Sequence, residues 1–229
     1  VSAGSVVVDP PSAFHVSCTL GLRCEARTNV SLGGEIVIID AANDCGNSPA
    51  LRFEEGVENP AASGGDGVFD LGVFREATVG DQYKVCWSSA IEGGSESFTT
   101  LLDEAMELVG PRLSGSFKCT LGVPCVVAVD GFKVPVTGQL HVVNQSCSDP
   151  VTTPGWSAVP RAPDAVTDSS ANFSLGVATG NPGVHSLCWG KAGAGSTLVE
   201  IGTIGLVGPQ SLSSSCTLGL RCVVTLNGV

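Results

Sequence analysis

Short runs in which apolar and polar residues alternate recur along this chain, and a period of two residues indicates half-buried β-strands. The clearest run is Tyr83-Lys-Val-Cys-Trp87, which would place Tyr, Val and Trp on one face and Lys and Cys on the other. Valine-rich and β-branched segments bounded by Gly, Pro, Asn or Asp predict further strands. These strands are predicted at Cys24–Val30, Glu35–Asp40, Val68–Phe74, Phe98–Leu102, Cys125–Val129, Gln139–Val143, Asn172–Val177, Leu198–Leu206 and Cys222–Leu226.

One segment has a helical pattern. Thr100–Leu108 contains good helix formers, and its apolar residues are spaced as on one helix face. The matching segment of the later chain, around Ile201 and Ile204, is rich in Gly and Thr, which a helix disfavours. Because the two segments belong to a repeat, we predict a strand at both.

The repeat is defined by its cysteines. Cys18-Thr-Leu-Gly-Leu-Arg-Cys24 returns as Cys119-Thr-Leu-Gly-Val-Pro-Cys125 and again as Cys216-Thr-Leu-Gly-Leu-Arg-Cys222. Successive cysteines of the first copy, at positions 18, 24, 45 and 86, and of the second, at 119, 125, 147 and 188, are separated by nearly the same intervals. Each fourth cysteine precedes a tryptophan, and each copy closes on Val-Gly-Pro. A period near one hundred residues is the size of a whole domain.

The repeat divides the chain into two domains and two partial ones. Residues 9–107 and 108–205 form the complete repeats, and residues 1–8 are interpreted as the last strand of a preceding repeat or a connector. Residues 206–229 begin a third repeat or contribute a strand to a neighbouring subunit, with Val223, Val224 and Leu226 as the assembly strand. We interpret the chain as a window of a longer secreted protein.

About seven short strands in roughly one hundred residues predict an all-β fold of tandem β-sandwich domains. Gly80-Asp-Gln-Tyr-Lys-Val-Cys-Trp87 resembles the neighbourhood of strand F in immunoglobulin-like domains. Together with the Cys-Thr-Leu-Gly motif, Cys45-Gly46 and the closing Val-Gly-Pro, it resembles tandem extracellular repeats of algae and related protists. The second copy departs from this pattern with Cys147-Ser148 and with His185 in the tyrosine position. The resemblance implies a glycosylated cell-surface fibre of disulfide-bonded, immunoglobulin-like repeats.

The amino-acid composition limits the kinds of binding partner that the chain can have. The chain has 11 basic and 22 acidic residues, which would repel nucleic acid over most of its surface. Residues 1–107 hold 17 of the acids and 5 bases, whereas residues 108–205 hold 5 of each. No eighteen-residue apolar span is present, so no membrane span is predicted in this segment.

Ten cysteines indicate an oxidising, extracellular compartment, since the spacing does not fit a zinc site. In Tyr83–Trp87 the cysteine lies on the face opposite the apolar side chains, where a loop cysteine can reach it. We therefore favour Cys45–Cys86 over the rival inter-sheet bond Cys24–Cys86. The favoured pairs are Cys18–Cys24, Cys45–Cys86, Cys119–Cys125, Cys147–Cys188 and Cys216–Cys222.

Three sequons, at Asn29, Asn144 and Asn172, predict N-glycans in an exported chain, where they would shield sheet edges. Further glycosylation, or hydroxylation of proline, is a hypothesis for the proline-rich segments. Its candidate positions are Pro10, Pro11, Ser12, Thr152 and Thr153.

Catalytic, metal and cofactor sites are not predicted. His15, His141 and His185 do not recur between the copies, and no nucleophile or phosphate-binding motif is present. The aspartates at 40, 44, 66 and 70 could suggest calcium, but their counterparts in the second copy are mostly apolar or small. We expect no enzyme activity and no cofactor apart from covalent glycans.

The leading functional prediction is a structural subunit of an extracellular filament, whose partners are copies of itself. Modules joined by short Gly-Pro connectors have little freedom, so the orientation of one repeat would set that of the next. The alternative is an adhesin or receptor ectodomain that binds carbohydrate or protein through its long loops, residues 54–67 and 148–171.

Overall fold

A computed structural model describes residues 14–28, 33–65, 67–89, 98–148, 155–156, 159–191, 197–210 and 213–228. Within these residues the regular structure consists of strands, and no helix is present. The predicted all-β class is confirmed. The chain divides into two compact units, the first formed by residues up to Thr19 with Arg23–Leu108, and the second by Leu20–Leu22 with residues from Val109 onward.

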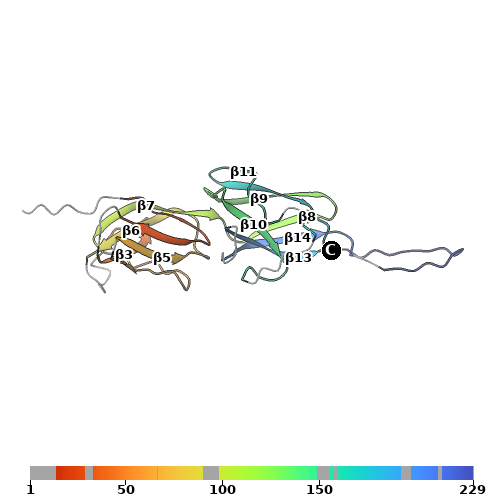
Figure 1. Cartoon of the computed structure of the whole chain (residues 1–229), viewed down its shortest axis with the longest axis horizontal. Coiled ribbons are helices and arrows are strands. Elements are labelled where there is room, and N and C mark those ends of the chain that lie inside the picture. The colour runs from red at the N-terminus through yellow and green to blue at the C-terminus, as the bar shows by residue number, and fades with distance from the viewer. Residues whose placement is uncertain are drawn as a thin grey trace, which may run out of the picture. The chain divides into compact units, whose positions relative to one another are not determined.

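In the first unit the strands form two groups (Figure 1). β2 pairs with β5, and β3 pairs with β4 and β6, which in turn pairs with β7; β1 also pairs with β7. The bounds are β1 Ser17–Thr19, β2 Arg23–Arg27, β3 Glu35–Asp40, β4 Ala61–Ala62, β5 Val68–Val73, β6 Gly80–Ser88 and β7 Thr100–Pro111, the last of which continues into the second unit.

The core of the first unit follows the predicted alternation. Along β2 the buried residues are Cys24 and Ala26, and along β5 they are Phe69 and Leu71. β3 differs because four consecutive residues, Ile36–Ile39, are buried. Burial on both faces of β3 requires a second layer of cover, which the loop containing Cys45 supplies.

Most of these pairings recur in the second unit, whose strands run from green to blue in Figure 1, but β4 pairs with β3 whereas β11 pairs with β12. β9 pairs with β12, β12 with β11, and a second group runs in the order β10, β13, β14, β8. The bounds are β8 Gly115–Thr120, β9 Pro124–Phe132, β10 Gly138–Val143, β11 Ala165–Val166, β12 Ser170–Val177, β13 Gly183–Lys191 and β14 Val199–Val207. β8 and β14 are parallel, and the other named pairs are antiparallel.

The strand predicted at Thr100–Leu108 from the repeat is confirmed, since β7 spans this segment. The prediction for Tyr83–Trp87 changes in two details. Trp87 is only half-buried and its indole N–H donates to the Gly33 carbonyl at 2.9 Å, whereas Cys86 is fully buried. The face predicted to look outward is therefore covered, whereas Trp87, which was predicted to lie on the buried face, is only half-buried.

The third copy differs most from expectation. No strand is assigned to Cys222–Leu226, although its counterparts in the complete repeats are β2 and β9. In those repeats the segment pairs with β5 or β12, and the described part of the third copy contains no such partner. Backbone that lacks a hydrogen-bonding neighbour does not satisfy the definition of a strand.

Candidate interaction surfaces and modification sites

The structure joins the ten cysteines in the five favoured pairs, and none is free. Cys45–Cys86 and Cys147–Cys188 each enclose a sequence separation of 41 residues, with Cα atoms 5.8 and 5.7 Å apart. Each lies in its own small apolar cluster. Val37, Ile39 and Phe98 surround Cys86, and Val143 and Leu198 surround Cys188.

The Cys-Thr-Leu-Gly tip of each complete repeat is hydrogen-bonded to the Val-Gly-Pro segment at the end of that repeat. The Leu20 N–H donates to the Val109 carbonyl at 2.9 Å, and the Leu121 N–H donates to the Val207 carbonyl at the same distance. The Val-Gly-Pro segments thus accept the same backbone hydrogen bond in both repeats. The motif that begins a repeat is therefore bonded to the motif that ends it.

The third tip, residues 213–228, differs from the first two because its apolar side chains face solvent. Figure 1 shows residues 213–228 as a blue loop extending from the strands of its unit. Its base is held by a hydrogen bond from the Gln210 N–H to the Asn227 carbonyl at 2.8 Å. The exposed fractions of its large apolar side chains are 102% for Leu218, 72% for Leu220, 74% for Val223, 45% for Val224 and 63% for Leu226.

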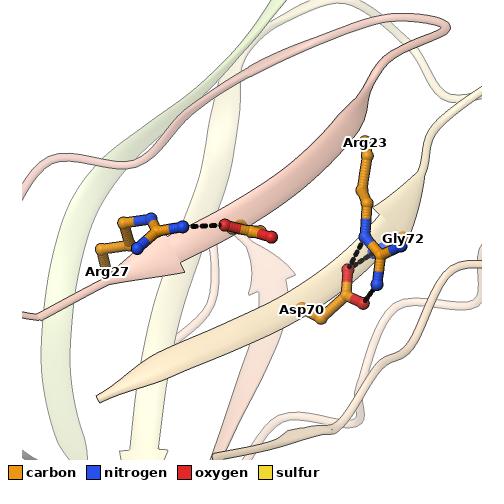
Figure 2. A network of polar contacts seen from close by, with 5 residues as sticks. Arg23, Arg27, Asp70 and Gly72 are labelled. Atoms are coloured by element: carbon orange, nitrogen blue, oxygen red, sulfur yellow. Dashed lines mark hydrogen bonds and ion pairs between the residues drawn. The ribbon is translucent and has the colours of Figure 1, made fainter. Parts of the chain in front are cut away.

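The outer face of β2 and β5 carries a charged ladder (Figure 2). The Arg23 guanidinium bonds both carboxylate oxygens of Asp70, and its Nε lies 3.2 Å from Oδ1. The Gly72 N–H donates to the same carboxylate at 3.0 Å, and Arg27 pairs with Glu25. The hydrogen bond from Arg23 lowers the pKa of Asp70, and its own pKa rises through the same bond.

Arg23→Gln is expected to lower stability slightly near neutral pH and not at all in strong acid. The lowered pKa of Asp70 means that the pair stabilises the fold above the unfolded pKa of about 3.9, and this contribution is lost as the pH falls through the lower, folded value. Both side chains are largely exposed, so solvent screens the pair. Urea midpoints of the variant and wild type at pH 6 and pH 2 measure the difference.

Arg221→Gln is the matched control, because Arg221 follows the same Thr-Leu-Gly-Leu sequence in the third copy and is exposed. It should leave both midpoints unchanged. A difference for Arg23→Gln that persists at the lower pH would show that the ion pair is not its cause.

At the corresponding positions the second unit has uncharged residues, and the exposed charge on this face of β9 is Asp130, the register partner of Ser170. Counted from the second cysteine of each tip, Glu25 and Arg27 correspond to Val126 and Ala128. Asp70 corresponds to Ser174 by strand register, because Glu25 pairs with Asp70 and Val126 pairs with Ser174. Val126 is 64% exposed. At the margin of this face Ser174 and Arg161 hydrogen-bond Asp164 and lower the pKa of its carboxyl.

Of the predicted sequons, two lie in the described chain. Asn172 is exposed on β12, and Asn144 is exposed directly after β10. Asn29 and the candidate positions Pro10, Pro11, Ser12, Thr152 and Thr153 lie outside the described residues. These modifications stay predictions.

Each of the three histidines has a different environment in the described structure. His185 takes the place of Tyr83, is buried beside Trp156, and its Nδ1 lies 3.2 Å from Asn144 Oδ1. Tyr83 instead donates its hydroxyl to the Thr78 carbonyl at 2.6 Å. Burial lowers the pKa of His141, and the exposed His15 lies 3.6 Å from Asp103 and from Glu107.

A cavity of about 420 Å³ opens on the first unit. Two partly or fully buried rings, Phe53 and Tyr83, are 6.1 Å apart at their centroids and form its apolar part. Its polar lining comes from Asp40, Arg52, Glu54, Glu76 and Gln82. The cavity is open and its lining is mostly polar, with the two rings as its aromatic part.

Among the described side chains no group of three or more His, Cys, Asp or Glu is placed to hold a metal ion. Asp70 is engaged by Arg23, and Asp40 accepts from the Ala42 N–H at 2.8 Å. In the same part of the chain no helix is long and apolar enough to cross a membrane.

Comparisons with known proteins give no family. No family model matches the chain, and no curated protein matches it. Among solved structures it is similar to the Bacteroides ovatus mixed-linkage glucan utilization locus protein SGBP-B in complex with a mixed-linkage heptasaccharide, at 13% identity and a TM-score of 0.27, over 93% of this chain and 51% of that one. The chain thus spans about half the length of that structure.

Two further structures have similar scores. Titin A168–A169 is 14% identical with a TM-score of 0.24, and 86% of this chain covers 95% of that one. Rst D1-D2 is 11% identical with a TM-score of 0.24, over the same shares of the two chains.

Sequence reasoning missed both outer faces, the one with the ion pairs on β2–β5 and the one with Val126, Ala128 and Asn172 on β9–β12. A signal was present, since Cys24-Glu-Ala-Arg27 and Cys125-Val-Val-Ala128 occupy the same repeat positions. The cavity gave no such signal, because its lining comes from separate segments at 40, 51–54, 76–78 and 82–83.

Proposed function

We propose that this chain is a structural subunit of an extracellular, glycosylated filament of tandem immunoglobulin-like repeats, in which copies of the chain bind one another. Five disulfides support an oxidising compartment outside the cell. The two units have corresponding strand pairings and corresponding bridges, which supports serial modules of one kind.

The observation that carries the proposal is the exposed third tip. Val224 corresponds to Ala26 and Val127, whose exposed fractions are 1% and 2%. In the third copy the same position is 45% exposed. The position belongs to the core in both complete repeats, and the proposal is that a strand of another copy covers it in the third, where the alternative cover is the remainder of a third repeat.

A partner strand explains how that cover would form. The segment 222–226 lacks the hydrogen-bonded neighbour that β5 and β12 provide to its counterparts. Addition of a strand from another copy would satisfy its backbone groups and bury its alternate side chains. This assigns Val223, Val224 and Leu226 as the assembly strand.

Leu218→Asp/Val224→Asp is expected to abolish assembly, because each substitution places a charge where an apolar contact forms. Negative-stain images of wild type should show elongated particles with a regular axial rise, and the double variant should give single particles. Sedimentation velocity over a concentration series measures the same loss in solution.

Val184→Asp is the matched control. Val184 lies on β13, is 70% exposed, and is remote in sequence from the third tip. It should assemble like wild type. Monodisperse, non-assembling wild-type particles, or equal loss in the control, would exclude the third tip as the assembly surface.

The binding-module alternative is favoured by the cavity of the first unit. Phe53 and Tyr83 offer ring surface, and Gln82 and Glu54 offer hydrogen-bonding groups, a combination suited to a polar ligand with an apolar face. Glycan-array binding that is lost on exchange of the loops at 54–67 and 148–171, or on Phe53→Ala, would support this function over the filament.

A further inference from the structure

The outer face of β9 and β12 combines apolar exposure with a modification sequence. Its inner side belongs to the core, since Val127, Val129, Phe173 and Leu175 are at most 2% exposed. The residues between them point outward, and Val126, Ala128, Asp130 and Asn172 are all exposed. This side of the β9–β12 pair is therefore open to solvent.

The strand register places the sequon in the middle of this face. Asn172 is the register partner of Ala128 on one side and of Ala165 on the other, and Ser174 is the partner of Val126. Val126 is thus the diagonal neighbour of Asn172, at a spacing of roughly 7–8 Å between Cα atoms. A group attached to the Asn172 side chain lies within reach of Val126 and Ala128.

The first unit shows that the fold does not require an apolar surface here. The corresponding positions hold Glu25, Arg27 and Asp70, with Val68 in the position of Asn172, and ion pairs engage all three charged side chains. The second unit has Val126, Ala128 and Ser174 at these positions, with a sequon at Asn172, and its exposed charge on β9 is Asp130. Exposed apolar positions on a sheet face tend to associate when nothing covers them.

We propose that Asn172 carries an N-linked oligosaccharide whose first sugars lie over Val126 and Ala128 and replace the charged ladder of the first unit as the solubilising layer. In its formation Asn172 Nδ2 bonds to the anomeric carbon of the first sugar and loses one proton. A lipid-linked oligosaccharide diphosphate supplies the sugar, and the lipid diphosphate leaves with the bonding electron pair. The sugar presents C–H groups to the two side chains and hydroxyl groups to water.

This inference does not depend on filament formation, so it is tested in the Leu218→Asp/Val224→Asp background, in which assembly through the third tip is blocked. The protein is secreted from a eukaryotic host, and glycopeptide mapping should find Asn172 occupied. Asn172→Gln should then raise the fluorescence of a hydrophobic dye and the self-association in sedimentation several-fold.

Two controls separate this effect from general loss of a glycan or of folding. Asn144→Gln removes the other described sequon, which lies outside β9–β12, and should behave like the parent. Adding Val126→Glu/Ala128→Arg to Asn172→Gln restores the residues of the first unit and should return dye binding and self-association to the parent level. An unoccupied Asn172, no change on Asn172→Gln, or no rescue by the grafted charges would each overturn the proposal.

Discussion

Cys45→Ala/Cys86→Ala lowers the free energy of unfolding of the first repeat by about 4 kcal/mol. The bridge closes a separation of 41 residues, and loop-closure entropy gives about 4 kcal/mol for a loop of that length. The Cys86 side chain is also fully buried among Val37, Ile39 and Phe98, so its loss leaves an underpacked site. Net stabilities of domains are about 5–15 kcal/mol, and this change removes a large share.

Hydrogen exchange with peptides resolved by mass spectrometry measures the effect separately in each unit. Cys18→Ala/Cys24→Ala is the comparison variant, because its bridge closes a separation of only 6 residues and should be worth about 2 kcal/mol. Protection in β3 and β6 should fall more in the first variant than in the second. Equal losses would mean that loop length does not govern the contribution of these bridges.

Trp189→Ala destabilises the second unit by about 3–5 kcal/mol, the range for loss of a buried large aromatic side chain. Trp189 is 1% exposed and packs edge-to-face on Phe173, with ring centroids 6.3 Å apart. Gly138 lies directly against the indole, where a Cβ would come within 2.0 Å of the ring. The site is therefore filled closely from both sides, and truncation leaves a cavity.

Trp87→Ala is the matched variant in the first unit, since both tryptophans follow the fourth cysteine of their repeat. Trp87 is only half-buried and contributes a single hydrogen bond to the Gly33 carbonyl, so its loss should cost clearly less. Guanidinium unfolding monitored by far-UV circular dichroism, with hydrogen exchange to assign each transition, gives both values. A larger loss in Trp87→Ala would contradict the packing described for Trp189.

The strands were the most predictable part of the fold, because alternation depends on local sequence and on the two faces of a strand. The strand at Glu35–Asp40 has the predicted bounds. At Thr100–Leu108 the comparison of the two repeats predicted the strand correctly, although the local sequence has a helical pattern. The burial of Cys86 was not predictable from alternation. It depends on the loop around Cys45, which covers the second face of β3 and β6.

The candidate sites also differ in whether local sequence could predict them. The sequons are sequence patterns and could be named at once, but the surroundings of Asn172 depend on register with Val126 and Ala128 across β9. The Arg23–Asp70 pair joins residues 47 positions apart, and no local pattern links them. The third copy was predicted to continue as a strand because its sequence matches β2 and β9, yet a strand also needs a neighbour.

The long bridges also limit how far a chain of such modules can lengthen under load. A fully extended backbone gains about 3.4 Å per residue, so the 41-residue separation between Cys45 and Cys86 could release about 140 Å if it were free. With the bridge closed, this segment contributes only the 5.8 Å between the two Cα atoms to the length of a stretched chain. Cys147 and Cys188 withhold a similar length in the second repeat, so a stretched molecule would yield mainly through the segments outside its covalent loops.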